Sequence, residues 1–140
     1  MPSSLSSLSP LRIDGVEIEV AEKPTDGDGG GATARAAIVM RGRMTSRNPD
    51  ASIQPFLKKV HEALCADKID RVEVDVTDLG FVNSSAIRLF VDWAMWVKGE
   101  GDAPHYKLVF RTKEGIAWQR LTLTALTGIA PTCVEVQPVG

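Results

Sequence analysis

The chain has 140 residues, of which 44% are hydrophobic and 24% are charged. This length and apolar content suit one compact domain that buries a core, and they exclude a chain that is disordered by composition. The formal net charge of −2 argues against a nucleic-acid-binding protein, because such proteins usually carry a basic face. The sequence has no apolar run long enough to cross a bilayer, so we expect no membrane insertion.

The N-terminal segment is rich in Ser and Leu and has no basic residue. A secretory signal needs a positively charged start and a longer apolar core, so we expect residues 1–10 to be a flexible tail. Residues 11–140 are expected to form one domain. We expect a cytoplasmic protein whose two cysteines, Cys65 and Cys133, are reduced and buried.

The first elements predict a β-hairpin. Residues 12–20 alternate between apolar and polar side chains, which indicates a strand with a turn or a bulge at Gly15. Residues 25–31 are Gly-rich and predict a hairpin loop, since glycine adopts positive φ without steric cost. A second strand is expected over residues 34–44.

A helix is expected to open within residues 46–55. Asp50 or Ser52 can cap it, and Pro55 is tolerated only near a helix start. The apolar residues that follow have helical spacing and form a single stripe: Ile53, Phe56, Leu57, Val60 and Leu64.

Strands and helices alternate through the rest of the chain. The pattern predicts a strand over 71–77, a helix over 84–98, a strand over 105–112, a helix over 115–127 that Gly128 ends, and a strand over 132–137. The order β-β-α-β-α-β-α-β predicts an α/β domain with a mixed sheet of about five strands and three helices.

The helix over 84–98 is apolar around most of its circumference. One stripe comprises Ile87, Phe90, Val91, Ala94 and Val97, and a second comprises Leu89, Trp93 and Trp96. A surface helix needs one apolar stripe. Either both stripes are core, or Leu89, Met95 or Trp96 reaches the surface as part of a partner-binding patch.

The junction before this helix carries a specific motif. Asp75-Val76-Thr77 is followed by Leu79, by Phe81-Val82 and then by Asn83-Ser84-Ser85-Ala86. This arrangement resembles the STAS domains, the family of anti-sigma factor antagonists and sulfate-transporter C-terminal domains. Leu126-Thr127-Gly128-Ile129 is similar to the Leu-Thr-Gly-Leu that ends the third helix in that family. The element order also agrees over residues 34–137, so the resemblance implies a STAS-like fold.

The resemblance also implies a phosphorylation switch. In the family, a cognate kinase, often the anti-sigma factor itself, phosphorylates the serine that follows the acidic residue. Ser84 has that position here, with Ser85 as the second choice. A helix N-terminus favours the phosphate, because its free N–H groups and the helix dipole attract anions. The alternative is that Ser84 is a helix cap with no regulatory role.

The motif departs from the family at three positions. Asn83 replaces the acidic residue, Ala86 replaces a glycine, and Thr45 replaces the acid that usually follows the second strand. Asn caps a helix about as well as Asp, so the fold should be preserved, but the charge is lost. The predicted partner-binding residues are Asn83, Ser84, Ser85, Ala86, Arg88, Leu89 and Asp92.

The sequence predicts no metal site, cofactor or catalytic centre. His61 and His105 lack ligand residues at metal spacing. Asp75 and Asp78 either hold Mg²⁺ or, as we expect, hydrogen-bond to the backbone and solvate the turn.

The favoured function is a non-catalytic, anti-sigma factor antagonist-like module of a partner-switching pathway. Its partner would be an anti-sigma factor or a related serine kinase. Two alternatives stay open. One is a constitutive STAS binding subunit of a transporter or signalling assembly that is not phosphorylated. The other is a nucleotide-binding protein that uses Ser84 and the aspartates.

Overall fold

The structure is a computed structural model that describes residues 10–13, 15–23, 35–45, 51, 53–99 and 106–139. The predicted Gly-rich loop, His105, and the predicted caps Asp50 and Ser52 lie outside these residues. The predicted N-terminal tail, residues 1–10, also lies outside the described residues, apart from Pro10. No helix within the described ranges is long and apolar enough to span a membrane.

The described strands form one six-stranded sheet in the order β1-β2-β3-β4-β5-β6. The strands are β1 Leu11–Ile13, β2 Val16–Lys23, β3 Arg35–Met44, β4 Arg71–Val82, β5 Lys107–Lys113 and β6 Val134–Val139. The first three strands pair antiparallel, and β3 to β6 pair parallel. The predicted mixed α/β sheet is confirmed, with one strand more than expected.

The additional strand comes from residues 12–20, for which the alternating pattern predicts a single strand. Gly15 lies in a turn with φ of +85°, and β1 folds back on β2 so that Ile13 is opposite Val16. Gly42 on β3 lies close to this turn, and a Cβ there would fall 2.0 Å from the Gly15 carbonyl oxygen. The Gly15 carbonyl accepts a hydrogen bond from Arg43 N–H at 3.1 Å, which joins the hairpin to the end of β3.

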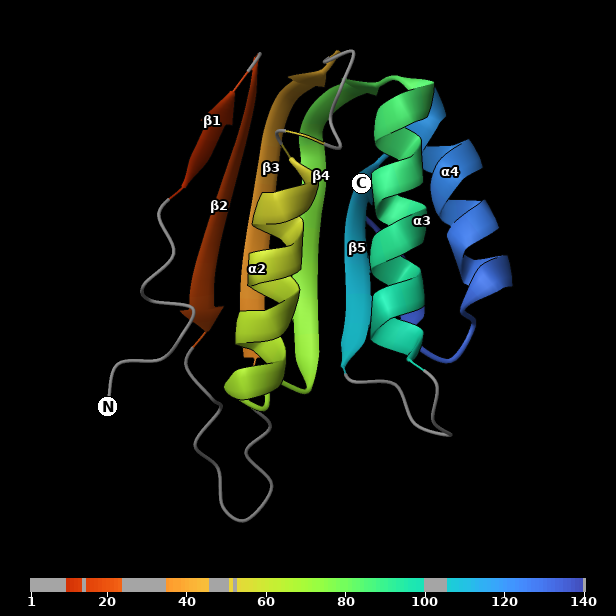
Figure 1. The fold of residues 1–140 in the computed structure, drawn as a ribbon. Coiled ribbons are helices and arrows are strands. Elements are labelled where there is room, and N and C mark those ends of the chain that lie inside the picture. Colours follow the sequence, from red (N-terminus) through yellow and green to blue (C-terminus); the bar gives the residue numbers. More distant parts are fainter. Residues whose placement is uncertain are drawn as a thin grey trace.

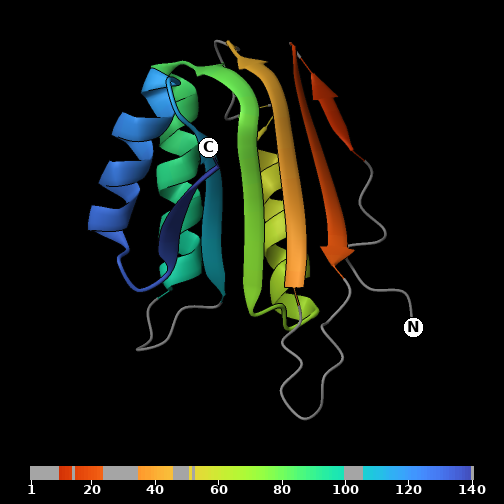
Figure 2. The ribbon, with the colours of Figure 1, turned by 180° about the vertical axis from the view of Figure 1, so that it is seen from behind.

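Three described helices cover one face of the sheet: α2 Gln54–Ala66, α3 Ser84–Lys98 and α4 Ala117–Ile129. Figure 1 shows α2 and α3 in front of the strands with α4 beside α3, and Figure 2 shows the opposite face of the sheet with no described helix over it. As predicted, Pro55 lies in the first turn of α2, but Ile53 is the N-cap and makes no side-chain cap hydrogen bond. The expectation that Gly128 ends α4 is wrong, because the helix continues to Ile129.

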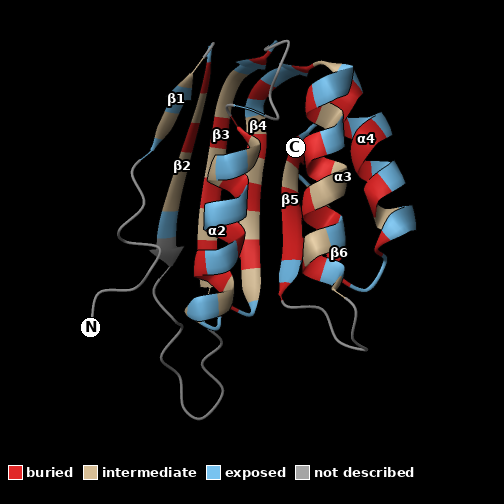
Figure 3. Ribbon diagram, viewed as in Figure 1, coloured by how far each residue is buried: buried red, intermediate tan, exposed pale blue. Residues whose placement is uncertain are grey.

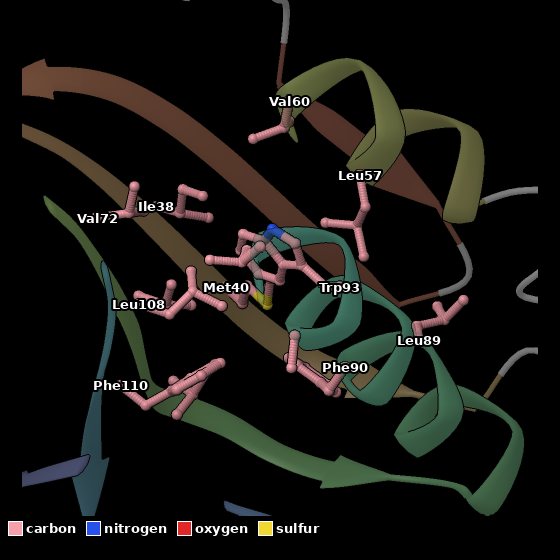
Figure 4. Close-up of a cluster of buried hydrophobic side chains, with 14 of the residues drawn as sticks. Ile38, Met40, Leu57, Val60, Val72, Leu89, Phe90, Trp93, Leu108 and Phe110 are labelled. Carbon is pink, nitrogen blue, oxygen red and sulfur yellow. The ribbon is translucent and has the colours of Figure 1, made fainter. Parts of the chain in front are cut away.

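The core lies between the helices and the sheet. Alternate residues of the central strands face the helices and are fully buried, among them Ile38, Val74 and Phe110. In Figure 3 the buried positions run along the inner faces of α2 and α3 and along the strands behind them. Figure 4 shows Phe90 and Trp93 of α3 pointing into this cluster, where Phe90 meets Phe110 edge-on at 6.1 Å between ring centroids.

The opposite face of the sheet carries cross-strand ion pairs. Arg41 lies 3.1 Å from Glu17, Arg71 lies 3.8 Å from Glu135, and Arg111 lies 3.9 Å from Glu73. Arg41–Glu17 and Arg111–Glu73 join neighbouring strands, whereas Arg71–Glu135 reaches across β5, and such surface pairs stabilise a sheet only modestly.

Candidate functional site

The second half of β4 positions the turn that leads into α3. β4 pairs with β5 only from Arg71 to Asp75, and beyond that point it continues alongside β3 until Val82 lies opposite Met44. The pairing shifts twice along this extension, between Val39 and Arg41 and between Gly42 and Arg43 of β3, and β4 has one extra residue at each shift. Asn83 N–H then donates to the Met44 carbonyl at 3.0 Å. Figure 1 shows the end of β4 curving over the sheet to the start of α3. β4 is therefore longer than the predicted strand over 71–77.

Asn83 is the N-cap of α3. Its backbone is extended, with φ of −77° and ψ of 171°, and its side-chain Oδ1 accepts a hydrogen bond from Ala86 N–H at 2.8 Å. Its carbonyl accepts from Ile87 N–H at 2.9 Å. The alternative that Ser84 caps the helix is therefore wrong, because the neighbouring amide fills that role.

Ser84 and Ser85 occupy the first two positions of α3, and both are exposed. The N–H groups at the start of a helix have no acceptor within the helix, so this end carries a partial positive charge. No acidic residue lies in the first turn of α3. Arg88 is exposed and lies four residues after Ser84, which brings it to the same face of the helix.

Two of the predicted partner-binding residues lie in the core. Ala86 and Leu89 are each only 1% exposed. The prediction that these two face a partner is wrong, because α3 packs between α2 and α4 and both of its sides are covered. Asp92 is half-buried, and its carboxylate accepts a hydrogen bond from Gln54 Nε2 at 3.4 Å.

The exposed apolar residue nearest to the turn in sequence is Phe81, which is 39% exposed. The Arg43 guanidinium lies over its ring, 5.1 Å from the centroid. Further along α3, Met95 is exposed, whereas Trp96 is half-buried beneath the Lys58 ammonium, 4.6 Å from the ring centroid. Sequence reasoning missed Phe81 as a surface residue because the regular alternation of β4 ends near Asp78.

The aspartates before the turn have a structural role. Asp75 Oδ1 accepts from Thr77 N–H at 2.9 Å and from the Thr77 hydroxyl at 2.6 Å, as the backbone-bonding interpretation predicts. Asp78 is exposed. The described residues contain no group of three His, Cys, Asp or Glu side chains able to hold a metal ion.

Two side chains of α4 hold the second half of β4. Trp118 Nε1 donates to the Leu79 carbonyl at 2.7 Å. Gln119 Nε2 donates to the carbonyls of Val76 and Leu79, and Gln119 Oε1 accepts from Lys113 N–H at 2.9 Å. Gln119 is 2% exposed, and nothing in the sequence distinguishes it from a surface glutamine. Both side chains therefore belong to the core rather than to the surface of α4.

A buried polar cluster joins α3 to α2 and to Tyr106, the residue just before β5. The Tyr106 hydroxyl accepts from Trp93 Nε1–H at 2.8 Å and lies 2.8 Å from His61 Nδ1. Burial raises the pKa of Tyr106. His61 also lies 3.9 Å from the Cys65 sulfur.

Both cysteines are free, and burial raises the pKa of each thiol, although Cys65 is only half-buried. These raised pKa values disfavour the thiolate, the form in which cysteine reacts.

Comparison with known proteins identifies the fold. No family model matches the sequence, and no curated protein matches it. The structure of an anti-sigma factor antagonist from Mycobacterium paratuberculosis matches with a TM-score of 0.51, covering 84% of this chain and 85% of that chain. The chain has a STAS-like fold. The sequence identity is 14%, at which the likeness shows the fold alone. The predicted fold class and the suspected resemblance are confirmed at that level.

Proposed function

We propose that this chain is a non-catalytic interaction module of a partner-switching pathway, acting as an anti-sigma factor antagonist does. Its partner is an anti-sigma factor or a related serine kinase in the cytoplasm. The observation that carries the proposal is the start of α3, where two exposed serines follow the Asn83 cap at the end of a STAS-like β4. Phe81, Ser84, Ser85 and Arg88 form the exposed part of the partner surface, which we call the α3 turn surface.

Phosphorylation of Ser84 is the proposed switch. A phosphoserine carries about −1.5 to −2 charge and three strong acceptor oxygens. At the first helical position these oxygens meet free backbone N–H groups, and Arg88 is one turn away. A partner that covers the turn would have to bury the dianion, so phosphorylation should weaken binding. Ser85, at the second position, is the second choice.

The switch needs no rearrangement of the helix start. The cap hydrogen bond runs from Ala86 N–H to the Asn83 side chain, so neither serine hydroxyl takes part in it. A phosphate on Ser84 therefore changes charge and bulk on a surface that keeps its shape.

A second candidate is a constitutive binding module that is never phosphorylated. Asn83 favours it, because the acid found here in the resembling family is absent and a kinase that reads this acid would not recognise the turn. In this candidate the α3 turn surface still binds a partner.

Mass spectrometry of the protein from its own source separates the two candidates. We expect phosphate on the peptide that contains Ser84, absent from a Ser84→Ala variant expressed in the same cells. Phosphate on Ser85 alone would move the switch by one residue. No phosphate under any growth condition, together with loss of partner binding in Ser84→Glu, would establish the constitutive module. Partner binding that Ser84→Glu leaves unchanged would contradict both.

A further inference from the structure

Two exposed arginines, Arg43 on β3 and Arg88 on α3, differ in their ion pairing from three other arginines of the sheet. Arg41, Arg71 and Arg111 on the open face each lie within 4 Å of a glutamate carboxylate. Arg43 and Arg88 are exposed, and neither forms an ion pair with a described residue. Arg43 lies near the end of β3, opposite Phe81, which is two residues before the Asn83 cap, and Arg88 lies in the second turn of α3, four residues after Ser84.

Among the described residues, the acidic groups of α3 and of the second half of β4 do not cancel this charge. The first turn of α3 has no acidic residue, and Asn83 and Thr45 are neutral. Asp92 accepts a hydrogen bond from Gln54, on the side of α3 that faces α2. Asp78 is the remaining exposed acid in the second half of β4. Counted over the described residues, Arg43, Arg88 and the positive end of α3 therefore make the α3 turn surface and the adjoining end of β3 locally cationic, in a chain whose net charge is −2.

We propose that the partner presents an acidic protein surface to the α3 turn surface, with carboxylates that pair with Arg43 and Arg88 around an apolar contact to Phe81. This inference rests on the proposed function, and it specifies the partner's chemistry. Arginine suits the role because its planar guanidinium binds a carboxylate through two parallel hydrogen bonds. The half-exposed Phe81 ring is the apolar anchor, and aromatic residues are typical of such contacts.

The same charges explain how phosphorylation would act. A phosphate on Ser84 lies within reach of Arg88 along the helix and would neutralise the charge that attracts the partner. It would also repel the carboxylates of the partner directly. Charge complementarity at an interface mainly sets orientation and association rate, so the switch should act strongly on association.

The test begins with photocrosslinking. Ser85 is replaced by p-benzoylphenylalanine in the full chain, the protein is irradiated in lysate from its source, and the crosslinked peptide is identified. We expect a peptide rich in Asp and Glu. The recombinant partner protein that contains this peptide is then the binding probe, and its Kd is measured at about 0.1 M and about 1 M ionic strength, where the Debye length falls from about 10 Å to about 3 Å.

Charge reversal supplies the decisive comparison. Arg43→Glu/Arg88→Glu should weaken binding about tenfold or more at the lower ionic strength and far less at the higher one. The matched control is Lys59→Glu/Lys98→Glu, which changes the net charge by the same amount. Lys59 is exposed on α2 and Lys98 is exposed at the far end of α3, so this variant should leave Kd within about twofold. Reversing the acids of the partner to Lys should restore binding to the arginine variant. Circular dichroism of each variant establishes that it is folded.

The outcomes distinguish this inference from the proposed function. If Phe81→Ala or Ser84→Glu weakens binding and the arginine reversal does not, the acidic partner is excluded and the α3 turn surface stands. A crosslinked peptide that is neutral or basic likewise excludes the acidic partner and leaves the surface in place. If position 85 yields no crosslink and no turn variant changes binding to a partner captured by the intact chain, both the inference and the proposed function are overturned.

Discussion

The β4–α3 and β5–α4 junctions are built from the same strand–turn–helix unit but direct their polar side chains in opposite directions. At the start of α3, Asn83 caps the helix, and Ser84 and Ser85 point to the surface. At the start of α4, the N-cap Ile116 makes no side-chain cap hydrogen bond, and Trp118 and Gln119 point inward to the carbonyls of β4. The start of α3 leaves its two serines exposed to solvent. The start of α4 uses its polar side chains to hold β4, the strand that leads into α3.

Because the polar side chains of the two junctions differ in exposure, we expect substitutions at one junction to change stability and substitutions at the other to change binding. Substitutions at the start of α4 should unfold or loosen the protein, whereas substitutions at the start of α3 should leave it folded and change what it binds. A buried polar group that loses its partner costs about 1–3 kcal/mol, while an exposed serine that is replaced costs little.

Gln119→Leu should have the largest effect on stability. The substitution leaves Lys113 N–H without its acceptor and the Val76 and Leu79 carbonyls without the amide donor. We expect the free energy of unfolding to fall by about 3 kcal/mol, measured by urea denaturation. Thr124→Ala on the exposed side of α4 is the control and should cost well under half as much. If Gln119→Leu lowered the free energy of unfolding as little as Thr124→Ala does, the hydrogen bonds of Gln119 would not be what stabilises this junction.

Alkaline unfolding should report the buried cluster that fixes the middle of α3. Tyr106 is the single tyrosine of the chain, and burial raises its pKa above the ordinary value of 10.0. The unfolded chain loses this proton near pH 10 while the folded chain keeps it. The contribution of this group to stability is therefore complete below pH 10 and falls by about 1.4 kcal/mol per pH unit as the pH rises toward the folded pKa.

Ultraviolet absorbance of the tyrosinate provides the measurement. It should appear together with the loss of helical circular dichroism as the pH is raised. Tyrosinate that forms near pH 10 in a protein that is still folded would show that the hydroxyl is accessible to water.

Trp118→Phe should cost about 1–2 kcal/mol. The phenyl ring can keep the stacking contact with Phe90, at 5.6 Å between ring centroids in the native protein, but it cannot donate to the Leu79 carbonyl. Thermal and urea unfolding measure the loss. Trp96→Phe is the matched control, because the Trp96 indole is half-buried and donates no hydrogen bond to a described residue. Equal costs for the two variants would mean that ring volume, not the hydrogen bond, accounts for the loss.

Asn83→Ala removes the cap of α3 and should cost about 1 kcal/mol of unfolding free energy. Asn83→Asp keeps an acceptor for Ala86 N–H, so its stability should equal or slightly exceed that of the native chain, because a negative charge favours a helix N-terminus. Urea titrations of the two variants side by side provide the check. A loss in Asn83→Asp as large as in Asn83→Ala would contradict the cap assignment.

Ser84→Ala should have the smallest effect on stability, within about 0.5 kcal/mol of the native chain, because the side chain is exposed and does not cap the helix. It should abolish phosphorylation while preserving partner binding. A large loss of stability would show that Ser84 has a structural role like that of Trp118 and Gln119 at the β5–α4 junction, and the two junctions would then not differ as described.

The pattern of the sequence predicts most of the fold but few of the side-chain directions. Alternation and helical spacing locate the strands and helices, since both reflect which side of an element is buried. The turn at Gly15 is predicted, but β1 is not recognised as a separate strand because the alternating pattern runs through both β1 and β2. The end of α4 is misplaced because Gly128 is exposed and tolerated within the last turn.

The candidate site is predicted in its polar part and missed in the rest. The order of residues in the motif identifies Asn83, Ser84 and Ser85. The prediction that Leu89 faces a partner is wrong because the sequence of one helix reveals two apolar stripes but does not reveal that neighbouring helices cover both of them. Gln119 could not be predicted at all, because its role depends on carbonyls that β4 leaves free only where it separates from β5.

Amide hydrogen exchange on the complex tests the central claim most directly. The chain is measured with and without its photocrosslinked partner, and protection is compared between residues 81–88 and residues 117–129. The N–H groups of Ser84 and Ser85 have no acceptor within α3, so they should exchange rapidly in the free protein and become protected when the partner covers the turn. Protection confined to 81–88 and its neighbours is the result we predict. Protection centred on α4 or on the open face of the sheet, with 81–88 unchanged, would contradict the account.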